Sequence, residues 1–496
     1  MAKTFKNFVG GNWVAPTTGR YFQNRNPADT SDLIGRFPDS GAQDIAAAVR
    51  SAREGFERWS RTPAPLRGDV LRRVGDLMVA RKEEIANAMT REMGKVLAET
   101  RGDVQEGIDT AYYAATEGRR LFGRTVPSEL RQKWAMSVRR PIGICGLITP
   151  FNFPMAIPTW KSFPALLSGN AVILKPSEDV PHTAHLLVEI LLEAGLPEQV
   201  IQLVHGGGDA GSALVSHPGV AAISFTGSTE TGSHIGEVCG RMHKRLSLEM
   251  GGKNAMIVMD DADLDLAVDG VLWGAFGTTG QRCTATSRLI VHRKVHDRLV
   301  ARVAEAAQKM VLGDGREART QVGPLIHEAA REKVERYVEI GLAEGAEMVC
   351  GGARPRGPRT ADGYFYKPTV FAGVKPGSRL ATEEIFGPVL SVIRVGSYEQ
   401  AVRVNNEVKY GLSSSIYTSD VNLAFRALDD LQNGITYVNA PTIGAEAHLP
   451  FGGVKQTGNG HREGGWEVYD FYSETKVCYV DYSGVLQRAQ IDTYDV

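Results

Sequence analysis

The chain has 496 residues, of which 43% are hydrophobic and 23% charged, a balance that is typical of a globular protein. A chain of this length exceeds what one hydrophobic core organises, so we expect about two or three structural units. Lys and Arg number 56 against 57 Asp and Glu, a formal net charge of -1. Because proteins that bind nucleic acids usually carry a basic excess, we expect no nucleic-acid partner.

The N-terminal residues 1–14 mix lysine and asparagine with aromatic side chains and lack the continuous apolar segment of a secretory signal. Helical periodicity follows over 42–117. A short apolar run at 142–149 ends at Pro150, as a buried strand does, and is far shorter than the roughly 20 residues of a membrane helix. We therefore expect a cytoplasmic protein without a membrane segment.

Strands and helices then alternate along the chain. The first series contains three strands and two helices, at residues 171–174, 200–204 and 221–225, and at 182–194 and 210–217. A second series follows Gly251, with strands at 255–259 and 288–292 and helices at 264–276 and 294–312. Strict alternation predicts parallel sheets with helices on both faces, so we expect two α/β units.

Residues 351–362, rich in Gly, Pro and Arg, are typical of an exposed turn. Two other segments have the pattern of strands. Residues 476–482 predict a strand with no obvious local partner, and 128–139 contain strand-like stretches as well. Since unpaired strands commonly pair across a subunit interface, we expect a homo-oligomer, either a dimer or a tetramer.

The five cysteines are odd in number and form no C-x-x-C pair, so we expect neither a disulfide framework nor a metal site. Four of them are interpreted as small buried side chains: Cys145, Cys239, Cys350 and Cys478. Cys283 lies in a Gly- and Thr-rich loop after a predicted helix, where small neighbours let a substrate approach. Arg282 beside it is expected to favour the thiolate, the reactive form. Taken alone, this loop leaves a nucleophile and an inert thiol as equal alternatives.

Glu249 ends an apolar strand and precedes a pair of glycines. A carboxylate in a mostly apolar setting has a raised pKa, which suits a general base near neutral pH. A helix cap or a salt bridge is the alternative role for such a residue, and from the residue alone it is the more frequent one.

Asn152 lies between aromatic residues directly after the strand predicted at 142–149. Ligands bind at the carboxyl ends of parallel strands, and a side-chain amide at that edge can stabilise an oxyanion. An asparagine that only forms a turn is the alternative.

Two further segments suit a dinucleotide. Around Gly227 and Ser228 a strand leads into a helix, whose exposed N–H groups can meet a phosphate. Upstream, Lys175 and Glu178 can hold ribose hydroxyls. The glycine run at 206–211 matches the G-x-G-x-x-G pattern poorly and is more typical of a turn.

Together these motifs resemble the aldehyde dehydrogenase superfamily, in that family's order and over essentially the whole chain. The resemblance implies an α/β fold with a Rossmann-like NAD-binding domain, a second α/β catalytic domain and a small β oligomerisation domain. Their implied residues are 1–122 with 141–251, then 252–470, and finally 123–140 with 471–496. The implied reaction is NAD-dependent oxidation of an aldehyde to a carboxylate through a cysteine thioester, with no metal ion.

The resemblance makes Cys283 the nucleophile and Glu249 the base that activates water, and it places Asn152 and the backbone N–H of Cys283 in the oxyanion hole. It places the following residues on the dinucleotide: Thr149, Phe151, Lys175, Glu178, Gly208, Phe225, Gly227, Ser228, Met250, Gly251, Glu384 and Phe386. Glu178 would repel a 2′-phosphate, which favours NAD as the cofactor, with NADP as the alternative.

In the substrate region the chain most resembles the antiquitin-like branch, which oxidises 2-aminoadipic semialdehyde in lysine breakdown. This resemblance implies Glu106 near the substrate ammonium and Arg282 as a clamp for its carboxylate. It also implies that the backbone N–H groups of Gly444 and Ala445 anchor that carboxylate. The implied substrate site is completed by Phe153, Trp160 and Thr284. A surface Glu106 without a special role is an equal alternative.

Other residues resemble a branch that acts on 2-oxoglutarate semialdehyde (2,5-dioxopentanoate): Met250, Lys253 and the segment 283–288. That substrate keeps a carboxylate but has no ammonium, so Arg282 would keep a partner and Glu106 would have none. A broad-range aldehyde dehydrogenase, a thiol esterase and a non-catalytic NAD-binding structural protein are further alternatives. The joint presence of a nucleophile, an oxyanion donor and a base disfavours the last of these.

Overall fold

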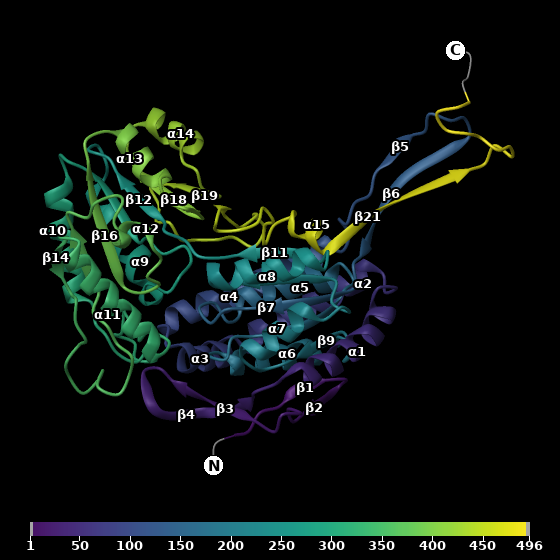
Figure 1. Cartoon of the computed structure of the whole chain (residues 1–496), viewed down its shortest axis with the longest axis horizontal. Helices are drawn as coiled ribbons and strands as arrows, with labels where there is room; N and C mark the ends of the chain where they lie inside the picture. Colours follow the sequence, from purple (N-terminus) through teal and green to yellow (C-terminus); the bar gives the residue numbers. More distant parts are fainter. Residues whose placement is uncertain (1–2, 493–496) are drawn as a thin grey trace.

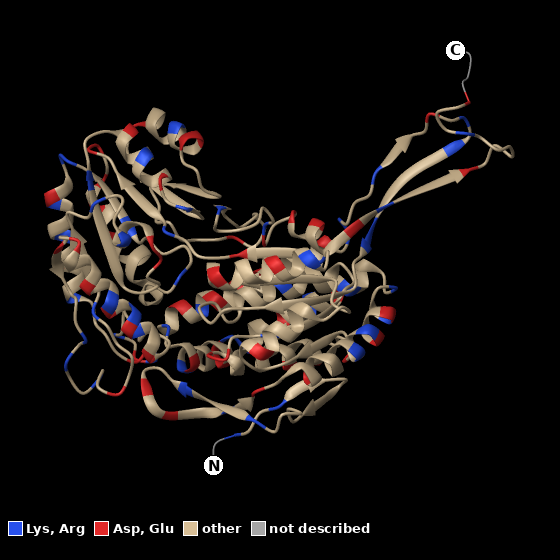
Figure 2. Ribbon diagram, viewed as in Figure 1, with Lys and Arg blue, Asp and Glu red and all other residues tan. Residues whose placement is uncertain are grey.

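The computed structural model describes residues 3–492 of the chain. Figure 1 shows two lobes that lie against each other and a narrow arm that extends away from them. Basic and acidic residues are spread over the molecule, and neither sign gathers on one lobe (Figure 2). Within the described residues, no helix is long and apolar enough to cross a membrane.

The first lobe is built on a seven-stranded sheet. From one edge to the other its strands are β11 (Arg245–Glu249), β10 (Ala222–Thr226), β7 (Ile144–Ile148), β8 (Ala171–Lys175), β9 (Ile201–Leu203), β1 (Asn7–Val9) and β2 (Asn12–Val14). The first five run parallel, and the hairpin of β1 and β2 adds antiparallel to β9. The parallel strands are continuous buried apolar runs, which confirms the strands predicted between residues 142 and 225.

Helices cover both faces of this sheet. On one face lie α2 (Ala64–Ala80), α3 (Lys82–Met93), α4 (Leu97–Glu117), α5 (Ala156–Leu167) and α6 (Pro181–Glu193). On the other lie α1 (Ala42–Trp59), α7 (Gly208–Ser216) and α8 (Thr229–Arg241). Val172 and Leu174 of β8 belong to the first core, and Ala171 and Ile173 to the second, because side chains alternate along a strand.

The second lobe repeats this architecture. Its sheet has the order β14 (Glu347–Cys350), β15 (Thr369–Ala372), β16 (Val389–Val395), β13 (Arg288–His292), β12 (Ala255–Val258), β18 (Ser413–Tyr417) and β19 (Ile435–Val438), parallel except where β14 meets β15. One face is covered by α9 (Leu264–Phe276) and α10 (His296–Lys309). The other is covered by α11 (Glu328–Ala343), α12 (Arg379–Thr382), α13 (Tyr398–Asn406) and α14 (Val421–Asp430). The two sheets confirm the predicted α/β fold.

The arm is a three-stranded sheet in which β6 (Lys133–Pro141) lies between β5 (Thr125–Pro127) and β21 (Ser473–Asp481). The strand predicted near the C-terminus therefore does have a partner in its own chain, because β21 pairs with β6 from Ser473 opposite Pro141 to Asp481 opposite Lys133. This partner is not local, as expected from the sequence, since it lies more than three hundred residues away along the chain. Within the described residues the outer edges of β21 and β5 carry no strand.

Short elements complete the molecule. They are the hairpin of β3 (Tyr21–Asn26) and β4 (Asp29–Pro38), the pair β17 (Tyr410–Gly411) and β20 (Val454–Lys455), the 3-10 turn η1 (Gly277–Gly280) and α15 (Val468–Tyr472). Residues 351–362 form neither helix nor strand, which confirms the predicted turn region.

Candidate active site

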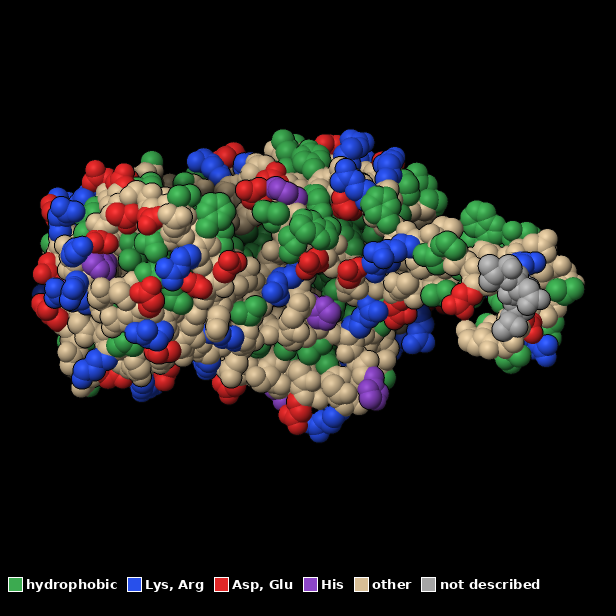
Figure 3. Space-filling model, turned by 90° about the horizontal axis from the view of Figure 1, so that it is seen from above, with side chains coloured by type: hydrophobic (Ala, Val, Ile, Leu, Met, Phe, Trp, Pro, Cys, Tyr) green, Lys and Arg blue, Asp and Glu red, His purple; other side chains and the backbone are tan. Residues whose placement is uncertain are grey.

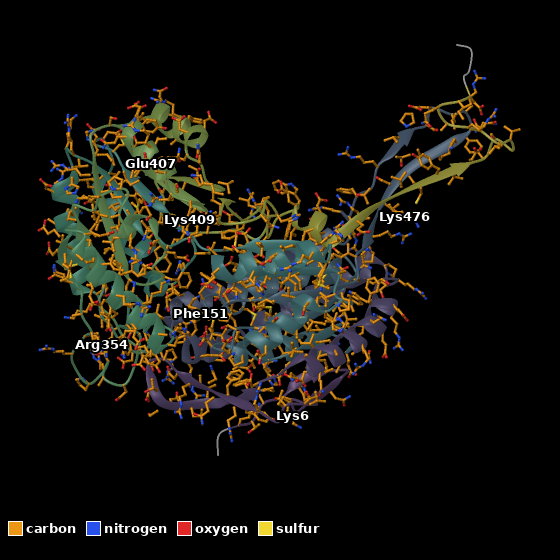
Figure 4. The ribbon with its side chains drawn as sticks, viewed as in Figure 1. Lys6, Phe151, Arg354, Glu407, Lys409 and Lys476 are labelled. Carbon is orange, nitrogen blue, oxygen red and sulfur yellow. The ribbon has the colours of Figure 1, made fainter. Side chains whose placement is uncertain are left out.

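A cavity of about 600 Å³ lies at the carboxyl ends of β7, β8 and β10, and we call it the first cavity. Residues of both lobes line it, and Phe151, labelled in Figure 4, lies where the lobes meet. Every residue predicted to hold a dinucleotide lines it: Thr149, Phe151, Lys175, Glu178, Gly208, Phe225, Gly227, Ser228, Met250, Gly251, Glu384 and Phe386. Lys333 of α11 lines it too, and no local sequence signal distinguishes this lysine from those of an ordinary surface helix.

Helix α8 presents its N-terminus to the first cavity. Ser228 is the N-cap, and its Oγ accepts a hydrogen bond from the Thr231 N–H at 3.2 Å. Gly227 before it has no room for a side chain, since a Cβ there would lie 2.5 Å from the ring of Phe225. The free N–H groups and partial positive charge at the start of a helix bind anions such as phosphate.

Lys175 and Glu178 lie at one end of the first cavity. The Lys175 Nζ is 3.5 Å from the Glu178 Oε2, and the Glu178 side chain is 52% exposed, whereas that of Lys175 is buried. Burial lowers the pKa of Lys175. The pair thus offers a donor and an acceptor side by side, as the hydroxyls of a ribose require.

Glu384 and Phe386 reach the first cavity from the second lobe. The Gly252 N–H donates to the Glu384 Oε1 at 3.0 Å, and a Cβ on Gly251 would lie 2.3 Å from the other carboxylate oxygen. Phe386 has a φ of 60° and its ring lies edge-on to Phe151 at 5.8 Å. The two glycines after β11 therefore let the backbone approach the carboxylate that is predicted to face the dinucleotide.

Cys283 lies in the loop that follows η1. Within η1, Thr278 and Thr279 have positive φ values of 51° and 56°. The side chain is partly exposed, and it lines both the first cavity and a second one. The Asn254 Nδ2 donates to the Cys283 carbonyl at 2.7 Å, and a Cβ on Gly252 would lie 2.4 Å from that same oxygen. Asn254 and Gly252, which belong to the segment that follows Glu249, thus fix the position of the thiol loop.

The surroundings of Cys283 oppose its ionisation. Burial raises the pKa of the thiol to about 12, and the charges of Glu384 and Glu249 add to the rise. Arg282 does not counter it, because its Nη2 pairs with the Glu99 carboxylate at 3.1 Å and its Nε donates to the Thr278 Oγ1 at 2.8 Å. The expectation that Arg282 favours the thiolate was therefore wrong.

Glu249 is the last residue of β11, and it is 3% exposed. Burial raises its pKa well above the ordinary value, and the nearby Glu463 adds to the rise. Its Oε1 has no hydrogen-bond partner within the described residues, and Glu249 forms no ion pair there. Burial thus produces the expected rise in pKa, and within the described residues Glu249 neither caps a helix nor forms a salt bridge.

Asn152 follows β7 and lines the first cavity, which also contains Cys283. The residue is 2% exposed, and its Oδ1 has no hydrogen-bond partner among residues 3–492. No described backbone group is bound by its side chain, so the amide does not simply close a turn. An amide that is buried without a partner at a cavity wall is available to a ligand.

The second cavity has a volume of about 270 Å³, shares Cys283 with the first, and is lined by residues of α4, α5 and the loop at residues 443–445. Every residue predicted to contact the substrate lines it: Glu106, Phe153, Trp160, Arg282, Thr284, Gly444 and Ala445. Glu249 lines it as well. Trp160 is buried edge-on against Phe451 at 5.0 Å, and its Nε1 has no partner among the described residues. Apolar side chains thus form much of a wall that leads to the thiol.

Two ion pairs flank the second cavity, and of their four members only Arg282 belongs to a motif in the sequence. Glu99 pairs with Arg282, and Lys95 pairs with Asp103 at 2.8 Å while its ammonium lies 3.5 Å from the centre of the Phe153 ring. Glu99 and Asp103 are one helical turn apart on α4. That spacing is the signal that could have found them, since acidic residues on a buried helix face need partners.

Glu106 lies one further turn along α4 and also lines the second cavity. Burial raises the pKa of this carboxyl to about 8, with Asp103 adding to the rise. In the same cavity, Gly444 has a φ of 123° and its carbonyl accepts a hydrogen bond from the Tyr437 hydroxyl at 2.5 Å. The N–H groups of Gly444 and Ala445 donate to no described residue, so they remain available to a ligand.

Comparison with known proteins agrees with this geometry. Residues 13–478 match the model of the aldehyde dehydrogenase family. Alpha-ketoglutaric semialdehyde dehydrogenase of Bacillus subtilis is 39% identical over 96% of this chain and 98% of its own length. Alpha-ketoglutarate semialdehyde dehydrogenase of Haloferax volcanii is 40% identical over 97% of this chain and 100% of its own length.

A solved structure is similar over the same extent. Betaine aldehyde dehydrogenase from Staphylococcus aureus, in complex with NAD+, has a TM-score of 0.95 at 32% identity and covers 99% of this chain and 97% of that chain. The family match, the two relatives and this structure each span nearly the whole molecule, and Cys283 lines both cavities, with Asn152 on the first and Glu249 on the second. The chain belongs to the aldehyde dehydrogenase family.

Proposed function

We propose that the protein oxidises 2-oxoglutarate semialdehyde to 2-oxoglutarate with NAD as the hydride acceptor. The observation that carries the reaction class is the position of Cys283, which lines both cavities and so can meet an aldehyde from one side and a cofactor from the other. The substrate is supported by the names of the two relatives, which are about 40% identical to this chain over nearly its whole length. The antiquitin-like assignment has no such support.

NAD fits the first cavity. The start of α8 at Ser228 would hold the pyrophosphate, Lys175 and Glu178 the adenosine ribose, and Glu384 the nicotinamide ribose. The negative charge of Glu178 would repel the 2′-phosphate of NADP, which favours NAD. When bound, the nicotinamide ring supplies the site with an acceptor for hydride.

Each side chain around the Cys283 thiol has a separate role in the proposed reaction. Glu249, whose raised pKa makes it a stronger base than an ordinary carboxylate, accepts the Cys283 proton so that the sulfur can add to the aldehyde carbon. Asn152 and the Cys283 N–H donate to the resulting oxyanion. Loss of hydride to the bound nicotinamide would leave a thioester on Cys283, and Glu249 releases the cysteine proton to solvent. Glu249 then takes a proton from the water that cleaves the thioester and returns it to the sulfur, which releases the thiol and a carboxylic acid that ionises to the carboxylate.

We also propose that the protein is a homo-oligomer assembled through the arm. Apolar side chains remain exposed on the arm, among them Trp134, Val477, Tyr479 and Val480, whose exposures lie between 51% and 65%. Figure 3 shows apolar side chains over the surface of the arm and over the neighbouring face of the body. A thin sheet that is exposed on both faces has no hydrophobic core of its own. A second copy of this chain is therefore expected to bury its apolar side chains.

The reaction is tested by following NADH formation with 2-oxoglutarate semialdehyde, 2-aminoadipic semialdehyde and pentanal. We expect the highest kcat/KM with 2-oxoglutarate semialdehyde and no NADH from the Cys283→Ala variant. Cys478→Ala, which removes a thiol on the arm, is the matched control and should keep wild-type activity. Turnover by Cys283→Ala would overturn the mechanism, and a higher kcat/KM for 2-aminoadipic semialdehyde would overturn the substrate.

One observation favours 2-aminoadipic semialdehyde as a second candidate. Glu106 lines the second cavity, and none of its side-chain oxygens bonds a described residue. An ionised carboxylate there would attract an ammonium group, which only this second substrate carries.

A further inference from the structure

Besides Glu249, the proposed base, the second cavity contains one acid that forms no ion pair within the described residues. Two other acids of α4 near it, Glu99 and Asp103, have close basic partners, which are Arg282 and Lys95. Glu106 lies on the same helix face, and it lines both the second cavity and the open chamber outside it. Neither of the nearby cations is within ion-pair distance of Glu106, since each is committed to another carboxylate.

An ionised Glu106 would conflict with the proposed substrate. 2-Oxoglutarate semialdehyde carries a carboxylate at the end remote from the aldehyde, and two like charges in a small cavity repel each other strongly. The two ion pairs add no net charge to the cavity, because the charge of Arg282 is offset by Glu99 and that of Lys95 by Asp103. The charge state of Glu106 therefore determines whether the cavity binds or repels an anionic substrate.

The groups around Glu106 favour the protonated carboxyl. Burial raises its pKa to about 8, and Asp103 and Asp109 of α4 add to the rise, whereas Lys95 and Arg282 oppose it. From β19, Tyr437 faces the same space with its hydroxyl already bonded to Gly444. A carboxyl group that keeps its proton is a hydrogen-bond donor instead of a repelling charge.

We propose that Glu106 donates a hydrogen bond from its carboxyl O–H to the distal carboxylate of the substrate, beside the guanidinium of Arg282. The Arg282 Nη1 has no hydrogen-bond partner among the described residues, so it can reach the same carboxylate. An O–H donor to a carboxylate makes a short, charge-assisted hydrogen bond. This inference rests on the proposed function, because it requires a substrate with a carboxylate at its far end.

The proposal predicts a particular pH dependence. Below the pKa of about 8 Glu106 holds its proton and binds the carboxylate; above it Glu106 loses the proton and repels that group. The measurement is the ratio of kcat/KM for 2-oxoglutarate semialdehyde to kcat/KM for pentanal, an aldehyde of the same chain length without a carboxylate. Because both substrates use Cys283 and Glu249, the titration of the reacting groups cancels in the ratio.

For the wild-type enzyme we expect this ratio to be constant below about pH 7 and to fall by about tenfold for each pH unit well above the pKa of Glu106. Glu106→Gln keeps an N–H donor at every pH, so its ratio should stay high and level. Glu106→Leu removes the donor and should give a low, level ratio. Asp109→Asn is the matched control on the same helix, and its ratio should fall with pH as in wild type, displaced only slightly to lower pH.

A second measurement does not depend on turnover. Binding of 2-oxoglutarate to the wild-type enzyme with NADH should take up a proton near pH 9, seen by calorimetry in buffers of different ionisation enthalpy, and Glu106→Gln should show less uptake. A level wild-type ratio together with no difference in proton uptake would overturn the role of Glu106. If the wild-type kcat/KM ratio of the two aldehydes is near one at every pH, the proposed substrate is wrong. If Glu106→Gln loses oxidation of 2-aminoadipic semialdehyde and the other variants keep it, Glu106 binds an ammonium group instead.

Discussion

Cys283 combines accessibility with a setting that keeps its proton in place. It opens onto two cavities, yet burial and the carboxyl groups of Glu384 and Glu249 raise its pKa to about 12. A thiol that stays protonated is protected from oxidation and from unintended alkylation. In the proposed mechanism its reactivity depends on a base that acts only when an aldehyde is in place, and Glu249 lines the same cavity as that aldehyde.

This setting predicts slow alkylation of Cys283 in the absence of ligands. At about pH 8 iodoacetamide should modify it at least tenfold more slowly than in the urea-unfolded chain, where the thiol regains its ordinary pKa, because only the thiolate reacts. The rate should keep rising up to about pH 10. Mass spectrometry of the peptide that contains Cys283 gives both rates, and a rate that levels off below pH 8 would contradict the raised pKa.

The residues proposed to react could be located from the sequence, and the residues that hold them in place could not. Glu249 and Asn152 each lie at the end of a predicted strand and Cys283 lies in a loop after a predicted helix, and the structure places all three on the walls of two joined cavities. The role of Arg282 depends on Glu99, which lies 183 residues away along the chain. Because an ion pair is set by the tertiary fold, no local pattern could show that the charge of Arg282 was already offset.

At the scale of the elements, α1 packs closely against the segment before β9. α1 packs against β8 and β9, and Gly55 on its buried face touches the backbone just before β9. A Cβ at position 55 would lie 2.2 Å from the carbonyl oxygen of Gln199. Since that neighbour is backbone, it cannot move aside without shifting the strand.

Gly55→Ala should therefore destabilise the protein, by about 1–3 kcal/mol, although alanine favours a helix more than glycine does. Gly240→Ala in α8 is the control, because a Cβ there meets nothing within 4 Å and should add up to about 1 kcal/mol of stability. Thermal unfolding followed by circular dichroism should place the two variants on opposite sides of the wild type. A Gly55→Ala variant as stable as Gly240→Ala would show that the helix can move away from the strand.

The alternating elements of both lobes were predictable because buried strands and amphipathic helices carry distinct patterns. The predicted strand at residues 142–149 is β7 at Ile144–Ile148, and the predicted helix at 294–312 is the shorter α10. In the arm, by contrast, most residues of β6 and β21 are at least partly exposed, so neither strand shows a clear alternation of apolar and polar residues. Their pairing joins two distant parts of the chain, which local patterns cannot detect.

At the scale of the whole molecule, the arm is the part that one chain alone does not explain. Figure 1 shows it standing away from both lobes, so most of its surface contacts nothing in the same chain. Trp134 and Val480 are directly opposite each other on β6 and β21, and they are 54% and 51% exposed. Large apolar side chains paired on an open face are costly in water unless another surface covers them.

Charging that face should separate the subunits. In the double variant Trp134→Glu and Val480→Glu, two carboxylates would have to be buried in the proposed interface, which costs several kcal/mol per charge. Light scattering after size-exclusion chromatography should then give the mass of a single chain instead of a multiple of it. Lys476→Gln is the control: this arm lysine, labelled in Figure 4, is exposed, and its replacement removes no apolar surface, so the mass should not change. A double variant that keeps the wild-type mass would place the interface elsewhere on the molecule, and a wild type with the mass of one chain would exclude the oligomer itself.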